Sequence, residues 1–93
     1  MIFIGFTQRI GRMDVESIRK FMEKRKDVER VILFCRQEPV DKVKELLEGF
    51  EVVVTKSPYK DAKRKAKEFK EKGKEVMVVD LQDFGERAIR DVC

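Results

Sequence analysis

Residues 75–90 read EVMVVDLQDFGERAIR, and this stretch decides the fold class. Its apolar run, residues 76–81, predicts a buried strand, and the polar turn that follows leads into a helix. Asp83 and Glu86 have the spacing of a capping box, which predicts that the helix starts at Asp83. A buried strand that runs directly into a helix is the repeating unit of α/β folds.

Three further units of this kind precede it in the chain. Apolar runs predict strands at residues 2–6, 28–35 and 51–55, and Gly5 within the first permits close backbone approach. Apolar residues at helical spacing follow each predicted strand. These are Val15, Ile18, Phe21 and Met22; Val40, Val43, Leu46 and Leu47; Tyr59, Ala62, Ala66 and Phe69; and, after the fourth strand, Ala88, Ile89 and Val92.

Capping residues predict where the first three helices begin and end. Asp14 is expected to cap the first helix, Pro39 to lie in the first turn of the second, and Ser57 to cap the third. Gly49 and Gly73 are expected to end the second and third helices in the left-handed conformation.

Regular alternation of strands and helices predicts a parallel sheet with right-handed crossovers and helices on both faces. The length of 93 residues suits one domain, residues 1–93, and no segment resembles a linker. We favour the strand order 3-2-1-4, half of a Rossmann-like sheet, because the first and fourth strands precede the most suggestive loops. The order 2-1-3-4 is the alternative.

Composition limits the class of protein. Charged residues make up 43% of the chain, Asn, His and Trp are absent, and this pattern favours a thermophile over a Lys/Glu-rich mesophile. A core this thin predicts a homodimer. No apolar run approaches the ~20 residues of a membrane span, and MIFIGF at the start is interpreted as a strand, so we expect a cytoplasmic protein without membrane contact.

Several kinds of site are disfavoured by the residues available. Without histidine, a Ser-His-Asp arrangement is excluded and a zinc site is not expected. Cys35 is interpreted as a buried thiol and Cys93 as the chain end. Neither GxGxxG after the first strand nor GxxxxGK[ST] occurs, so we expect no cofactor. Asp80 and Asp83 are close enough in sequence to be weighed as magnesium ligands, but Asp83 is assigned to the helix cap, so we expect no metal.

Polar and cationic residues follow all four predicted strands, and parallel strands bring such residues to one edge. With free helix N–H groups, this edge could bind an anion or nucleotide. The alternative is that polar loop ends are ordinary in α/β domains. The predicted ligand-binding residues are Thr7, Gln8, Arg9, Arg36, Lys56, Ser57, Gln82, Gly85 and Arg87.

The third predicted helix is strongly basic. Residues 56–74 hold nine Lys or Arg against three Asp or Glu, a net charge of +6, whereas the rest of the chain is slightly acidic. This surface is an alternative site for nucleic acid or an acidic partner, although a solvated lysine face is the commoner explanation. Nucleic acid is not favoured, because Tyr59 is assigned to the core. The alternative residues are Lys60, Lys63, Arg64, Lys67 and Lys70.

Residues 76–91, VMVVDLQDFGERAIRD, resemble a motif of CARF domains, the Rossmann-like ligand sensors of CRISPR-associated proteins. Asp80 takes the Asn/Asp place, Gln82 the Thr place, and Gly85 and Arg87 lie nearby, whereas residues 83–84 replace paired glycines. MIFIGFTQR and VERVILFC are similar to the start of that family. The resemblance implies a homodimer that binds cyclic oligoadenylate across both copies and, as in some members, a ring nuclease that cleaves it through the ribose 2′-hydroxyl.

Overall fold

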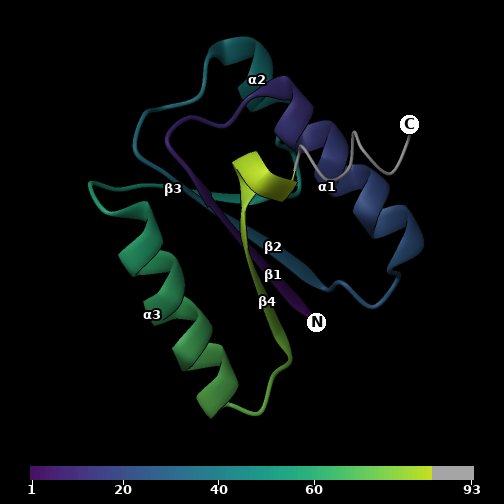
Figure 1. Ribbon diagram of the computed structural model, residues 1–93. Helices are drawn as coiled ribbons and strands as arrows, with labels where there is room; N and C mark the ends of the chain where they lie inside the picture. Colours follow the sequence, from purple (N-terminus) through teal and green to yellow (C-terminus); the bar gives the residue numbers. More distant parts are fainter. Residues whose placement is uncertain (85–93) are drawn as a thin grey trace.

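Strands and helices alternate along the chain, as the sequence predicts. The computed structural model describes residues 1–84 of the chain (Figure 1). Residues 81–84 form a short helical segment after the last strand. The elements are β1 (Ile2–Thr7), α1 (Arg12–Lys24), β2 (Arg30–Cys35), α2 (Asp41–Leu46), β3 (Glu51–Val54), α3 (Pro58–Glu71) and β4 (Val76–Asp80).

The strands form one parallel sheet in the order β3-β2-β1-β4. The favoured order, 3-2-1-4, is therefore confirmed, and the alternative, 2-1-3-4, is wrong. The central strand β1 pairs with β2 on one side and β4 on the other, so that Ile4 lies between Ile32 and Val78. The chain moves outward from β1 to β3 and then returns across the sheet to β4, which is the topology of a small Rossmann-like domain.

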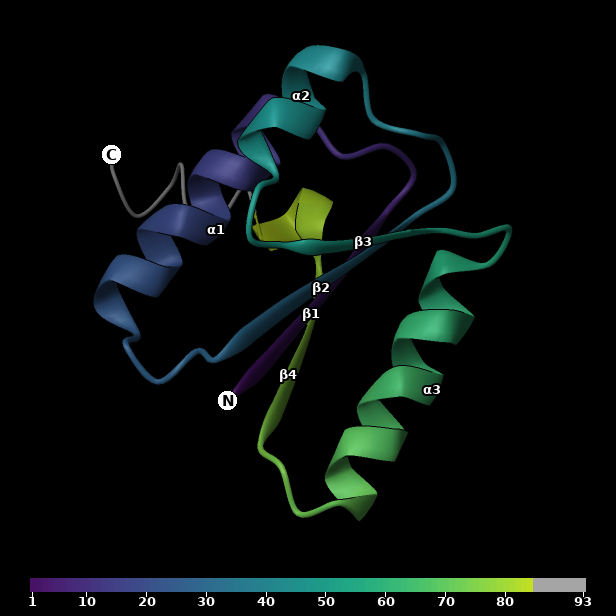
Figure 2. The same cartoon turned by 180° about the vertical axis from the view of Figure 1, so that it is seen from behind.

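Helices cover both faces of the sheet, which is usual when all strands are parallel (Figures 1 and 2). Phe3 of β1 belongs to the core beneath α1 and α2, whereas its neighbours Ile2 and Ile4 pack in the core beneath α3. Ala62 and Ala66 of α3 are buried against the sheet, and their small side chains let the helix lie close to it.

Side chains, rather than another backbone segment, approach Gly5 closely. A Cβ atom at Gly5 would lie 2.7 Å from Cδ2 of Leu81 and 3.1 Å from Cδ2 of Leu33. Leu81, the first residue after β4, is fully buried. It occupies the space that a side chain at residue 5 would need, directly over the central strand.

Two helix starts differ from prediction. Gly11, not Asp14, caps α1, and the Asp14 carboxylate accepts a hydrogen bond of 2.8 Å from the Gly11 N–H as the third residue of a capping box. Pro39 lies before α2, whose cap is Val40. Ser57 caps α3 as predicted, with Pro58 at its first position, although its side chain makes no capping hydrogen bond. The predicted left-handed glycines are confirmed, with φ of 88° at residue 49 and 81° at residue 73.

The predicted helix start at Asp83 is wrong. Asp83 lies inside the helical segment 81–84, and Asp80 instead accepts a 3.1 Å hydrogen bond from the Gln82 N–H. The Asp80 carboxylate thus satisfies the free N–H group of Gln82, and the helical segment 81–84 can begin directly at the end of β4. Glu86 and the predicted apolar positions Ala88, Ile89 and Val92 lie outside the described residues.

Cys35 is fully buried at the end of β2, as predicted, and burial raises the pKa of its thiol. Of the helices within residues 1–84, none combines the length and the apolar composition that crossing a bilayer requires.

We predict that Gly5→Ala destabilises the domain by about 1–3 kcal/mol, because the added methyl overlaps the packed Leu81 side chain. Urea unfolding followed by circular dichroism measures the change. Gly11→Ala is the matched control, since its nearest contact would be 3.6 Å away, and should cost less than about 1 kcal/mol. In a Leu81→Ala background the Gly5→Ala cost should shrink; an unchanged cost would contradict this contact.

Candidate functional site

A groove runs between α3 and the neighbouring strands β1 and β4. Its volume is about 530 Å³, which is within the range of small-ligand sites. It lies beside the point where the chain reverses direction across the sheet, between β1 and β4, the place where open α/β sheets commonly bind ligands. The lining residues are Phe6, Tyr59, Lys63, Ala66, Lys67, Lys70, Val78 and Asp80.

The floor of the groove is apolar. Phe6 of β1 and Val78 of β4 face α3 because even-numbered residues of both strands point to that side of the sheet. Ala66 faces them from the helix and is only 4% exposed. Its short side chain leaves the space above Phe6 and Val78 open, so a planar or apolar part of a ligand can lie there.

The position of Tyr59 differs from the prediction. The helical spacing assigned it to the core, but it is 50% exposed and lines the groove. Its ring meets the Phe6 ring edge-on, with 5.1 Å between centroids. Tyr59 is in the first turn of α3, beside the carboxyl end of β1. The exposed part of the ring can therefore contact a ligand.

Three lysines form one wall of the groove. Lys63, Lys67 and Lys70 are spaced four and three residues apart, which places them on one side of α3. The Lys63 ammonium lies 4.8 Å from the centre of the Tyr59 ring. Among residues 1–84, the ion pairs on α3 involve Arg64 and Lys65, and none involves these three lysines. Their ammonium groups are therefore available to an anion.

Among residues 1–84, Asp80 is the one carboxylate in the groove lining. Only its Oδ1 atom has a hydrogen-bond donor within residues 1–84, the Gln82 N–H. The other oxygen is available to a donor on a ligand, such as an amino group or a hydroxyl. The described residues hold no cluster of three or more His, Cys, Asp or Glu side chains that could bind a metal ion.

Asp80 also affects the opposite face of the sheet. Burial raises the pKa of Asp14, the Gly11 N–H hydrogen bond lowers it, and the negative charge of Asp80 raises it. The net shift is upward, so the folded protein holds this proton more tightly than the unfolded chain. The unfolding free energy contributed by Asp14 therefore falls as pH rises from 3.8 through the raised pKa.

The predicted ligand edge is only partly brought together. The N–H groups of Arg36 and Gln37 donate to the Gln8 carbonyl at 3.0 and 2.8 Å, so the first two loops are joined. Gln8, Arg9 and Arg36 are exposed, and Thr7 ends β1. These residues form a cationic rim at the carboxyl ends of β1 and β2, outside the groove lining.

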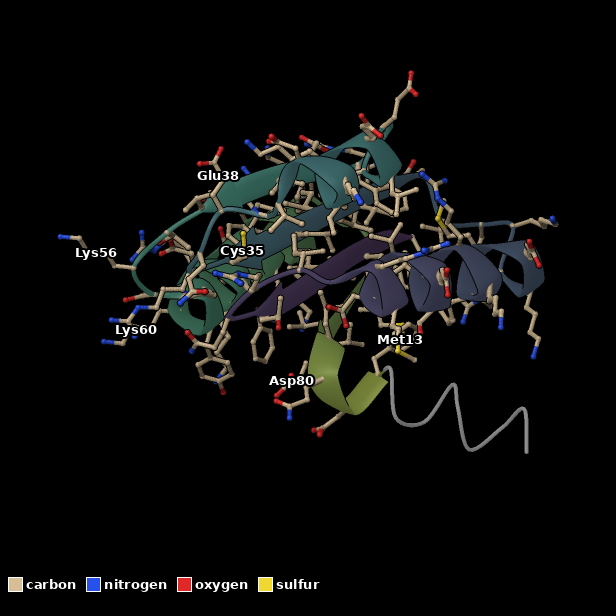
Figure 3. The ribbon with its side chains drawn as sticks, turned by 90° about the horizontal axis from the view of Figure 1, so that it is seen from above. Met13, Cys35, Glu38, Lys56, Lys60 and Asp80 are labelled. Atoms are coloured by element: carbon tan, nitrogen blue, oxygen red, sulfur yellow. The ribbon has the colours of Figure 1, made fainter. Side chains whose placement is uncertain are left out.

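The predicted residues after β3 and β4 lie apart from each other. Three strand spacings separate β3 from β4, roughly 14 Å, and so Lys56 and Ser57 do not reach Gln82. Lys56 and Lys60 extend away from the domain (Figure 3). Gln82 is exposed beside Asp80, and Gly85 and Arg87 lie outside the described residues.

The basic residues predicted as the alternative nucleic-acid site do not all lie together in the structure. Lys63, Lys67 and Lys70 line the groove, Lys60 points outward, and Arg64 lies 3.9 Å from the Asp61 carboxylate. Sequence reasoning missed the floor residues and the role of Asp80 in the groove. Once the strand order is assumed, alternation along β1 and β4 would have placed residues 6, 78 and 80 on the face beneath α3.

No family model, curated protein or solved structure matches this chain. The resemblance to CARF domains therefore rests on the residues alone and stays a prediction.

We predict that Asp80→Asn lowers the pKa of Asp14, because it removes a negative charge that raises it. Carboxyl chemical shifts followed by NMR through an acid titration measure this pKa. Asp83→Asn, a neighbouring exposed carboxylate, is the control and should leave the titration of Asp14 unchanged. Equal effects of the two substitutions would contradict a specific coupling between Asp14 and Asp80.

Proposed function

We propose that this domain binds a nucleotide, or a related ligand that joins phosphate to a planar group, in the groove beside α3. One observation carries the proposal: Lys63, Lys67 and Lys70, without an ion-pair partner among residues 1–84, border an apolar floor next to a half-exposed tyrosine. Ammonium groups attract phosphate, and an exposed aromatic ring provides a stacking surface for a base.

The ends of the groove differ, and this orients the ligand. Tyr59 and Asp80 lie toward the carboxyl ends of the strands, since Tyr59 is in the first turn of α3 and Asp80 is the last residue of β4. Lys70 lies near the other end of α3. A base beside Tyr59 would place an amino group or ribose hydroxyl near the free oxygen of Asp80, and its phosphates would extend toward Lys67 and Lys70.

The CARF resemblance adds a specific candidate, cyclic oligoadenylate bound by two copies of the domain. Adenine carries an exocyclic amino group, which suits a carboxylate acceptor such as Asp80. Cleavage of that ligand would use its own ribose 2′-hydroxyl as nucleophile, and the groove would contribute positioning and positive charge.

A second candidate, nucleic acid, is favoured by the length of the basic stripe. Lys60 continues the line of Lys63, Lys67 and Lys70 at helical spacing beyond the groove. A polynucleotide along this stripe would contact all four lysines, and its affinity would fall steeply with salt.

Tyr59 is the only tyrosine and there is no tryptophan, so intrinsic fluorescence reports directly on the groove. We expect ADP to quench Tyr59 fluorescence. Lys67→Ala should weaken ADP binding about tenfold through loss of a charged phosphate contact, and so should Lys70→Ala. Lys20→Ala, which removes an exposed charge from α1 on the opposite face, should leave the affinity unchanged.

Comparing the binding of several ligands distinguishes the candidate functions. Pyrophosphate should bind more weakly than ADP; equal affinity would contradict a role for Tyr59 in binding a base. Cyclic tetraadenylate that binds more tightly than ADP would support the CARF ligand. Oligonucleotide binding that Lys60→Ala weakens as much as Lys67→Ala would favour the basic stripe, and no quenching by any probe would contradict the nucleotide proposal.

A further inference from the structure

Strand β3 forms an edge of the sheet (Figures 1 and 2), and no strand of residues 1–84 pairs with its outer side. The Thr55 N–H donates to the Cys35 carbonyl at 2.8 Å, so backbone groups of residue 55 point toward β2. Because these directions alternate along a strand, Val53 also points its backbone toward β2, and the N–H and C=O groups of Val52 and Val54 point outward.

The side chains at this edge are apolar and partly uncovered. Val53 is 39% exposed and Val54 is 52% exposed. On the α2 side, Val52 and Val54 line a groove of about 400 Å³ together with Leu47 and Phe50. At the opposite edge, by contrast, all five residues of β4 are half-buried. An apolar edge strand with free backbone groups is a template for pairing with another strand.

We infer that β3 pairs with β3 of a second copy of this chain, antiparallel and around a two-fold axis, so that two four-stranded sheets become one. A register centred on Val53 places Val52 opposite the partner's Val54 and Val53 opposite the partner's Val53. The outward N–H and C=O groups of residues 52 and 54 then bond to each other across the axis. The exposed valines of both copies cover one another.

Charge along β3 favours this antiparallel partner. Glu48 and Glu51 lie at the start of the strand, and Lys56 follows its end. Arg30 already pairs with the Glu51 carboxylate at 2.6 Å, so of these three charges those of Glu48 and Lys56 are without an ion-pair partner among residues 1–84. An antiparallel copy brings the basic end of one strand beside the acidic start of the other, whereas a parallel copy would align like charges. The lysine-lined groove lies beside β4 at the other edge of the sheet, so the dimer leaves this groove open in each copy and places the two copies' grooves at opposite ends of the joined sheet. A cyclic oligoadenylate shared by two copies would therefore require a different dimer.

Sedimentation of the full chain tests the inference. We expect a species of twice the 11.0 kDa chain mass at micromolar concentration. Val53→Lys places two ammonium groups directly opposite each other, and we expect it to raise the dimer dissociation constant at least tenfold while circular dichroism shows an intact fold. Met13→Lys alters another exposed apolar residue, on α1 (Figure 3), and should leave the dimer unchanged.

Cross-linking provides an independent test in a Cys93→Ser background. Diamide takes two electrons and two protons from the thiols of Val53→Cys in paired copies, which joins them by a disulfide that dithiothreitol reverses. Met13→Cys should cross-link much more slowly. A wild-type monomer at high micromolar concentration would overturn the inference. So would a dimer that Val53→Lys leaves intact and Val53→Cys does not cross-link.

Discussion

The contact between Leu81 and the bare backbone of Gly5 holds the carboxyl end of β4 against the central strand. Leu81 is fully buried on the face covered by α1, and this burial fixes the end of β4, where Asp80 lies. Alternation along β4 turns Asp80 toward α3, the side that Val78 also faces, and Leu81, which begins the helical segment 81–84, is buried on the opposite face. A core contact on one face of the sheet thus places a carboxylate in the groove on the other.

The two faces of the sheet are covered unequally. Two helices and the segment 81–84 pack on one face, whereas α3 alone packs on the other (Figures 1 and 2). A helix about 10 Å wide covers roughly two strands that are 4.8 Å apart, so one helix cannot cover four. The open strip between α3 and β4 is the lysine-lined groove, and Val53, which faces the same side from β3, is left exposed. The proposed ligand site and the proposed dimer edge therefore have one structural origin.

The site was less predictable than the fold because it depends on which strands become neighbours. Loop cations were grouped at one edge on the assumption that all four loops meet, but the strand order separates Lys56 from Gln82. Tyr59 fits the apolar stripe of its helix, yet it lies at the end of the sheet, where a stripe position has little to pack against. Asp83 has capping-box spacing, but the helical segment 81–84 begins earlier, because the Asp80 carboxylate accepts a hydrogen bond from the Gln82 N–H.

The sequence by itself determined the alternation of strands and helices, their parallel arrangement and the left-handed glycines at residues 49 and 73, because periodicity and turn chemistry are local properties of the chain. The sequence marked Gly5 as a place of close approach, but only the tertiary structure put Leu81 there. The sequence also placed a surplus of lysine on α3. Only the tertiary structure decided which lysines share a groove with Asp80, and that Val53 and Val54 remain exposed. These features depend on the side of the sheet to which each crossover returns and on how much of each face a single helix can cover, and neither is encoded in any one segment.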